Sequence, residues 1–205
     1  NLYTGLKLSI NTVTAHLMQK LGTNSPYSVR RFVSKMGIDS SKIRPYPSIC
    51  LGSMDLSVFE MVGAYSTFAN EGEWVEPIFI TRIEDKYGNI LEEFAPKSTE
   101  AMRKQTAYAL CKMMELTTMS GGTASRMRTT YGIPATIPIA GKTGTTQNNS
   151  DGWFIGITPD LVSGAWVGCE DRQVHFRSTA LGQGGHMAMP IFAYYMREIY
   201  NDPSI

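Results

Sequence analysis

The 205-residue chain has little net charge and no long apolar segment. It contains 19 Lys and Arg against 18 Asp and Glu, scattered along the sequence, so its formal net charge is +1. Neither a basic stripe nor an acidic tail is present, and we expect no nucleic-acid partner. No run approaches the roughly 18 consecutive apolar residues of a membrane span. The length is sufficient for one domain with a substantial core.

Cysteine and histidine are scarce, and neither residue forms a cluster. Cys50, Cys111 and Cys169 are widely separated and belong to no Cys-x-x-Cys or Cys/His pattern, so the usual spacing of zinc ligands is missing. We expect buried free thiols, with one disulfide left open as an alternative. We expect no metal and no cofactor. The histidines are predicted to be structural or exposed: His16, His175 and His186.

Apolar spacing predicts helices through most of the first two thirds of the chain. Ser57 and Glu60 form a capping-box pattern at the start of one of them. The segment 40–53 is predicted to be an irregular loop. The other predicted helices cover 10–21, preceded by Ser9 and closed by Gly22, then a segment that follows Pro26 and ends at Gly37, and 99–119.

The last third changes to short β-like segments at 137–142, 153–157 and 162–167. A hairpin is predicted earlier, over 77–94, around the turn Tyr87-Gly88-Asn89. A final helix begins at Met189 with Pro190 in its first turn. Helices, then antiparallel strands, then a covering helix indicate an α+β fold in which helices flank an antiparallel sheet.

The stretch IAGKTGTTQNNSDGWF, from Ile139 to Phe154, permits two interpretations. Gly141-Lys142-Thr143 matches the end of a phosphate-binding loop, but the position that must be Gly is Thr136. A phosphate-loop lysine also opens a helix, whereas this one precedes Gly144 and a polar loop. We therefore reject nucleotide binding. The run 182–185 lacks dinucleotide-binding spacing and is predicted to be a flexible turn before the last helix.

The alternative is the Lys142-Thr143-Gly144 strand of an enzyme that attacks carbonyl groups, paired with Ser9-Ile10-Asn11 upstream. Around these motifs the chain resembles the transpeptidase domain of penicillin-binding proteins, most closely class A. The resemblance spans nearly the whole chain and includes four segments: LSINTVTAHLMQKLG, LGSMDLSVFEMVGAYSTFANEGEWVEP, GKTGTTQNNSDGWFIGITPDLVSGAWVG and GGHMAMPIFAYYM. It implies a penicillin-binding and serine β-lactamase-like fold and the domain assignment 1–205, a partial transpeptidase domain.

The resemblance also implies a role for each matching residue. Ser9 would relay a proton toward the leaving amine, and the Asn11 amide would hold a backbone group of the substrate. Lys142 would supply positive charge. The hydroxyls of Thr143 and Thr145 would bind the substrate's terminal carboxylate, and the Thr145 backbone N–H would donate into an oxyanion hole. Gly144 would leave room for substrate along the strand edge.

Each of these residues also has a purely structural interpretation. Ser9 would be a helix N-cap, Asn11 a solvated residue of the first turn, and Lys142 a surface lysine at a strand end. For Asp151 and Trp153 we favour the structural interpretation, as loop closure and strand packing.

The family's nucleophile, the serine of Ser-x-x-Lys, has no match in this sequence. No lysine has a serine three residues before it, and before Lys42 that position is Asp39. The start, NLYTGLKLSI, lacks an initiator Met and a signal-peptide pattern. We expect the C-terminal part of a transpeptidase domain, with the nucleophile helix and the early strands upstream. A D,D-carboxypeptidase or serine β-lactamase-like hydrolase, and a non-catalytic wall-binding pseudo-enzyme, stay open.

The resemblance implies peptidoglycan stem peptides as substrates and β-lactam antibiotics as ligands. It also implies a parent protein on the extracytoplasmic face of a bacterial membrane, anchored outside this sequence. An upstream glycosyltransferase domain would be consistent with the class A character.

The absence of Ser-x-x-Lys generates the first prediction. Incubated with a fluorescent penicillin, the 205-residue chain should take up no stable label, because no activated serine is present to form the acyl-enzyme. Label would be quantified by in-gel fluorescence against a known penicillin-binding protein. Stable labelling at one equivalent per chain would contradict the assignment.

Overall fold

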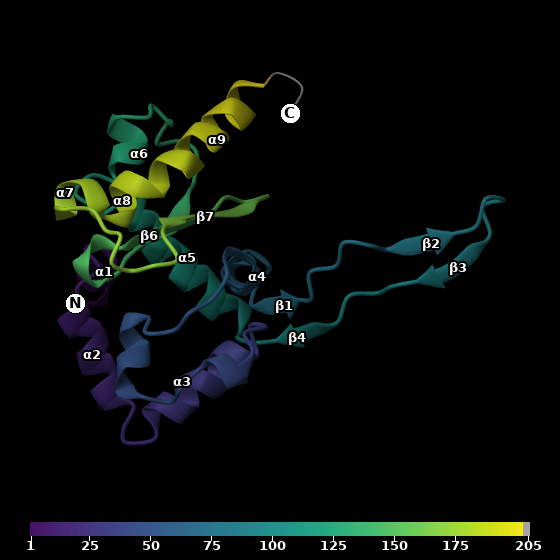
Figure 1. Ribbon diagram of the computed structural model, residues 1–205, viewed down its shortest axis with the longest axis horizontal. Helices are drawn as coiled ribbons and strands as arrows, with labels where there is room; N and C mark the ends of the chain where they lie inside the picture. The colour runs from purple at the N-terminus through teal and green to yellow at the C-terminus, as the bar shows by residue number, and fades with distance from the viewer. Residues whose placement is uncertain (203–205) are drawn as a thin grey trace.

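A computed structural model describes residues 1–202 (Figure 1). The N-terminal half is mainly helical, and the C-terminal half contains a three-stranded sheet with helices on both sides. In chain order the elements are α1 (Leu2–Lys7), α2 (Asn11–Lys20), α3 (Ser25–Ser34), the 3-10 helices η1 (Ser40–Lys42) and η2 (Pro47–Leu51), α4 (Val58–Ala69), β1 (Glu73–Val75), β2 (Arg82–Glu84), β3 (Ile90–Glu93), β4 (Ser98–Glu100), α5 (Lys104–Thr118), α6 (Arg126–Thr129), β5 (Ala140–Thr145), η3 (Gln147–Asn149), β6 (Asp151–Ile157), β7 (Val162–Gly168), α7 (Thr179–Gly182), α8 (Gly184–Met187) and α9 (Met189–Asn201).

The main sheet has the order β5-β6-β7 and is antiparallel throughout. On β5, Lys142 lies opposite Ile155 and Gly144 opposite Trp153. Within residues 1–202 only β6 pairs with β5, so the other edge of β5 is unpaired. The α+β class and the antiparallel sheet flanked by helices are confirmed.

Apolar side chains fill both faces of this sheet. On one face the ring of Phe154 packs edge-on against Phe192 of α9, and both residues are at most 2% exposed. On the other face Met114 of α5 packs with Ala140 and Ile157. A further core, which includes Met18, Met36, Ile43 and Ile49, lies among α2, α3, η2 and the helices α4 and α5.

Two threonines at the end of α5 fix the start of β5. Thr117 Oγ1 donates to the Gly141 carbonyl at 2.8 Å, and Thr118 Oγ1 donates to the Ile139 carbonyl at 3.0 Å. Both threonines are fully buried. A buried hydroxyl that loses its partner costs roughly 1–3 kcal/mol, so these bonds hold the entry to β5 in one position.

A thin arm leaves the body through two antiparallel strand pairs (Figure 1). β1 pairs with β4, and farther out β2 pairs with β3. The tip is the predicted Tyr87-Gly88-Asn89 turn, where Gly88 has a φ of +82°. The hairpin predicted over 77–94 is confirmed.

Several other local predictions are confirmed. The capping box is present: Glu60 N–H donates to Ser57 Oγ at 3.2 Å, and Ser57 N–H donates to Glu60 Oε2 at 2.9 Å. The helix from Met189 is α9, with Pro190 in its first turn. Gly22 and Gly37, beyond the ends of α2 and α3, both have positive φ, as helix-terminating glycines do.

Several elements differ from the predictions. The helix predicted from Thr99 begins at Lys104, because Ser98–Glu100 pairs with β1. The segment 40–53 contains η1 and η2, and 182–185 belongs largely to α7 and α8 rather than to a flexible turn. The short helix α1 was not predicted.

The first strand of the sheet covers 140–145 instead of 137–142. Arg128 explains the shift, because its guanidinium donates to the carbonyls of Pro134 and Ile137 at 2.5 and 2.8 Å. The carbonyls of Pro134 and Ile137 therefore accept hydrogen bonds from a side chain and not from a neighbouring strand. Pro138 has no N–H to donate to a neighbouring strand.

The three cysteines are free, as expected, but they are not fully buried. Cys50 and Cys111 are half-buried and Cys169 is exposed. Burial raises the pKa of the Cys111 thiol.

The capping box supplies a stability prediction. Ser57→Ala should lower the free energy of unfolding by about 1 kcal/mol, because one backbone donor of α4 loses its acceptor. Urea denaturation followed by circular dichroism measures the change. Ser28→Ala, at an exposed position inside α3, is the matched control and should be neutral or slightly stabilising. An equal change in the free energy of unfolding for Ser57→Ala and Ser28→Ala would contradict the capping role of Ser57.

Candidate active site

Ser9 lies in the tight turn between α1 and α2, and its backbone is left-handed, with a φ of +55°. Its N–H donates to the Leu6 carbonyl at 3.2 Å, and the next N–H, of Ile10, donates to Gly5 at 2.8 Å. The N-cap of α2 is Ile10, without a side-chain cap. The simple N-cap interpretation of Ser9 is therefore wrong. A non-glycine residue in this conformation costs on the order of 1 kcal/mol, and such strain clusters at functional positions.

Lys142 connects this turn to the sheet. Its Nζ donates to Ser9 Oγ at 2.7 Å and to the Thr143 carbonyl, also at 2.7 Å. The two residues are 133 positions apart, so the contact depends on the whole fold. Lys142 is half-buried, and its amine points toward a hydroxyl. The interpretation as a surface lysine is wrong.

Burial lowers the pKa of Lys142 from 10.5 to about 8, because desolvation disfavours the ammonium form. At neutral pH the amine is mostly protonated, yet it can exchange a proton at little cost. A group with a pKa this close to the working pH is suited to acid–base work. The hydroxyl of Ser9 is the side-chain oxygen to which it is bonded.

Thr143 and Thr145 follow Lys142 on β5, and each hydroxyl has a different partner. Thr143 Oγ1 donates to Thr123 Oγ1 at 2.9 Å. Thr145 Oγ1 accepts the Gly184 N–H at 3.0 Å. Because Thr145 accepts in that bond, its own proton stays available for a ligand. Thr145 is exposed, and Thr143 is half-buried.

Glycines let α8 approach β5 closely. A Cβ on Gly184 would lie 2.2 Å from the Gly144 carbonyl oxygen and 2.5 Å from that of Trp153. A Cβ on Gly185 would lie 2.6 Å from the Thr123 carbonyl oxygen. These backbone oxygens cannot give way, so only glycine fits.

Sequence reasoning missed Gly184, Gly185 and Thr123 as parts of the site. The available signal was the density of glycine in 182–185 and at 121–122.

Asn11 is the first residue of α2 and is exposed. It lies two residues after Ser9. Within residues 1–202 the side-chain amide of Asn11 has no hydrogen-bond partner. The structure therefore brings Ser9, Lys142, Thr143 and Thr145 together, with Gly144 between the threonines, and leaves the Asn11 side chain at the margin. Asp151 is buried in β6, in agreement with a structural role.

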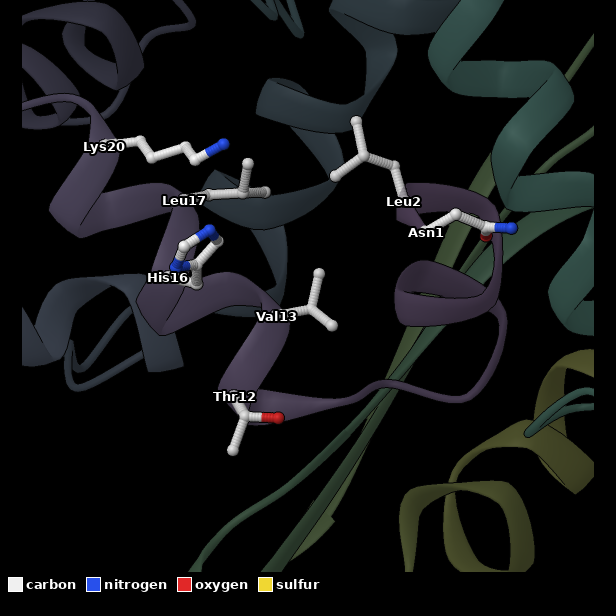
Figure 2. A pocket seen from close by; sticks show the side chains of 7 residues that line it. All are labelled: Asn1, Leu2, Thr12, Val13, His16, Leu17 and Lys20. Atoms are coloured by element: carbon white, nitrogen blue, oxygen red, sulfur yellow. The ribbon is translucent and has the colours of Figure 1, made fainter.

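A separate groove of about 500 Å³ lies between α1 and α2 (Figure 2). Val13 and Leu17 point from α2 toward Leu2 on α1, and His16 stands at the same side of α2. The lining is mainly apolar and includes none of the residues around Lys142. Across residues 1–202, no three His, Cys, Asp or Glu side chains are placed to hold a metal ion. In the same part of the chain, no helix is both long and apolar enough to cross a membrane.

Comparison with known families matches residues 1–196 to the penicillin binding protein transpeptidase domain. Penicillin-binding protein 1A of Aquifex aeolicus is 34% identical over 194 residues, which are 93% of this chain and 24% of the relative. Penicillin-binding protein 1B of Vibrio cholerae is 31% identical over 196 residues, 96% of this chain and 24% of the relative. The chain thus spans about a quarter of the length of these curated relatives.

Solved structures of similar proteins agree with the fold. The PonA1 protein of Mycobacterium tuberculosis, in complex with penicillin V, superposes with a TM-score of 0.79 at 25% identity, over 98% of this chain and 56% of that one. Penicillin-binding protein 1A of Haemophilus influenzae gives a TM-score of 0.80 at 22% identity, over 99% and 34%.

The buried amine supplies a third prediction. In a pH titration followed by NMR of the lysine side chains, Lys142 should titrate near pH 8, because burial disfavours its charged form. Lys112 is the internal control, since its hydrogen bond to Glu115 raises its pKa above 10.5. A Lys142 midpoint at or above 10.5 would refute the desolvated environment.

Proposed function

This chain belongs to the penicillin-binding protein transpeptidase family, and from that premise we propose that it is the C-terminal part of a peptidoglycan D,D-transpeptidase. The parent enzyme would cross-link stem peptides through a serine acyl-enzyme and would be acylated by β-lactams. The single observation that carries the proposal is the 2.7 Å bond between Lys142 Nζ and Ser9 Oγ, which joins two distant segments at one point.

The chemistry requires a nucleophilic serine from outside these 205 residues. A base beside that serine, also outside these residues, takes its proton as the oxygen attacks the carbonyl carbon before the terminal D-alanine, and the carbon–nitrogen bond of that peptide breaks. The departing amine needs a proton, which Ser9 Oγ donates as Lys142 replaces it from its ammonium group. The amine of a second stem peptide then attacks the ester and loses a proton to the same relay, while the serine leaves and takes its own proton back from the base that held it. Splitting the acyl transfer in this way replaces one high barrier by two lower ones.

Negative charge develops on the carbonyl oxygen during each attack. The backbone N–H of Thr145 is the donor on this chain that we assign to that oxyanion, and one such donor is typically worth about 100-fold or more in rate. Gly144 carries no side chain, and the outer edge of β5 is unpaired among residues 1–202. An extended peptide can therefore lie along this strand, with the Asn11 amide as a further contact for its backbone.

The substrate ends in a carboxylate, and β5 presents hydroxyls toward it. Thr145 retains a free proton, since its oxygen accepts from Gly184. Thr143 lies two residues earlier on the same strand and contributes through its hydroxyl pair with Thr123. The nearby Lys142 ammonium adds attraction for an anion. β5 and the residues bonded to it thus form one wall of the site, and we assign residues 1–205 to a single partial domain.

The relatives are four times longer than the matched region. We propose that the parent protein faces the extracytoplasmic side of a bacterial membrane, is anchored by a segment outside this chain, and carries a glycosyltransferase domain upstream.

A fourth prediction tests the role of Lys142. In the full-length protein, Lys142→Ala should lower the rate constant for acylation by penicillin about 100-fold or more, because the proton relay loses its donor. The measurement is a fluorescent-penicillin time course, with folding checked by circular dichroism.

Lys20→Ala, at the exposed end of α2, is the matched control and should acylate normally. Near-normal acylation of folded Lys142→Ala would contradict the proposed relay. Analysis of the products released from a stem-peptide substrate would separate transfer to an amine from hydrolysis.

A further inference from the structure

Thr123 lies in the loop between α5 and α6, far from β5 in sequence but in contact with it. Its Oγ1 accepts the Thr143 hydroxyl at 2.9 Å, and its side chain is exposed. The residue adds a hydroxyl to the row formed by Thr143 and Thr145, and it comes from another part of the fold.

The loop holds Thr123 through its backbone. The Thr123 N–H donates to the Lys7 carbonyl at 3.3 Å, and the next N–H, of Ala124, donates to Thr117 at 2.9 Å. The Thr123 carbonyl faces Gly185, where a Cβ would be only 2.6 Å away. The end of α1, the end of α5 and α8 therefore fix the position of Thr123 without using its hydroxyl.

The Thr123 hydroxyl still has a proton to donate, because it accepts in its hydrogen bond with Thr143. Each threonine hydroxyl has one proton and two lone pairs. Between Thr143 and Thr123 one proton is shared, donated by Thr143, so the proton of Thr123 is not needed for the pair. Thr145 likewise keeps its proton, because its oxygen accepts from Gly184. Two exposed donors thus flank the half-buried Thr143.

A positive charge lies near the loop that carries Thr123. The side chain of Lys7 reaches the glycine loop next to Thr123, with Nζ 3.7 Å from the position of a Cβ on Gly121. Two hydroxyl donors and a lysine near the same loop match the two oxygens and the charge of a carboxylate.

We propose that Thr123 is a specificity residue that donates a hydrogen bond to the terminal carboxylate of the substrate or β-lactam. The inference rests on the proposed transpeptidase function and extends the carboxylate site beyond β5. Thr143 then acts partly as the link that orients Thr123, and Thr145 supplies the second direct donor.

The experiment compares acylation of the full-length protein by benzylpenicillin and by its methyl ester, whose carboxylate is blocked. Thr123→Val keeps the shape of the side chain and removes the donor. It should slow acylation by benzylpenicillin by about 10- to 100-fold, the usual effect of losing a hydrogen bond to a charged group. Acylation by the ester should stay within about twofold of the rate of the unmodified protein. The ratio of the rate with the free acid to the rate with the ester therefore falls.

Two further variants separate binding from structure. Thr123→Ser retains the donor and should restore most of the rate and the preference for the free acid. Thr106→Val, at an exposed position in the first turn of α5, is the matched control and should change neither rate. If Thr123→Val proves unstable by thermal melting, Thr123→Ala against Thr123→Ser gives the same comparison.

Equal losses with the acid and the ester, or no loss with either, would overturn the role of Thr123. The proposed function would survive that result if Lys142→Ala still abolished acylation. If the unmodified full-length protein formed no acyl-enzyme with benzylpenicillin, the proposed function itself would fail.

Discussion

The contact between the Lys142 amine and the Ser9 hydroxyl is the interaction around which the site is organised. It requires a left-handed turn between α1 and α2, an amine partly removed from water, and a fixed position of β5 relative to that turn. Thr117 and Thr118 satisfy the third requirement, because their buried hydroxyls donate to the carbonyls of Gly141 and Ile139, at and just before the start of β5. The packing of Phe154 against Phe192 supports the same strand from the opposite face. The contact between Lys142 and Ser9 thus depends on core contacts far from Ser9 in sequence.

Two glycines beside β5 allow a close approach of backbones. Gly184 and Gly185 bring α8 against β5 and the Thr123 loop, where any side chain would collide with carbonyl oxygens. This contact lets a backbone N–H orient the Thr145 hydroxyl. The site is therefore preorganised by main-chain atoms, which lose little conformational freedom when a ligand binds.

Features with a local cause were predictable from the sequence. The Ser57–Glu60 capping box, the hairpin turn at Gly88 and the helix from Met189 each depend on residues within one or two turns of each other, and all are present. Lys142 and its neighbours were found through motif spacing and a family resemblance. Features with a tertiary cause were missed. The true start of β5 depends on Arg128, and the place of Thr123 depends on three elements that meet only in the folded chain.

The left-handed backbone of Ser9 has a consequence for how the protein can change over time. Glycine would relax that turn at little steric cost, so a substitution that removes the hydroxyl would also relieve strain. Fold stability and the proposed proton relay therefore make opposite demands on this one position. A glycine at position 9 is expected to stabilise the fold and to remove the hydroxyl that the proposed relay uses.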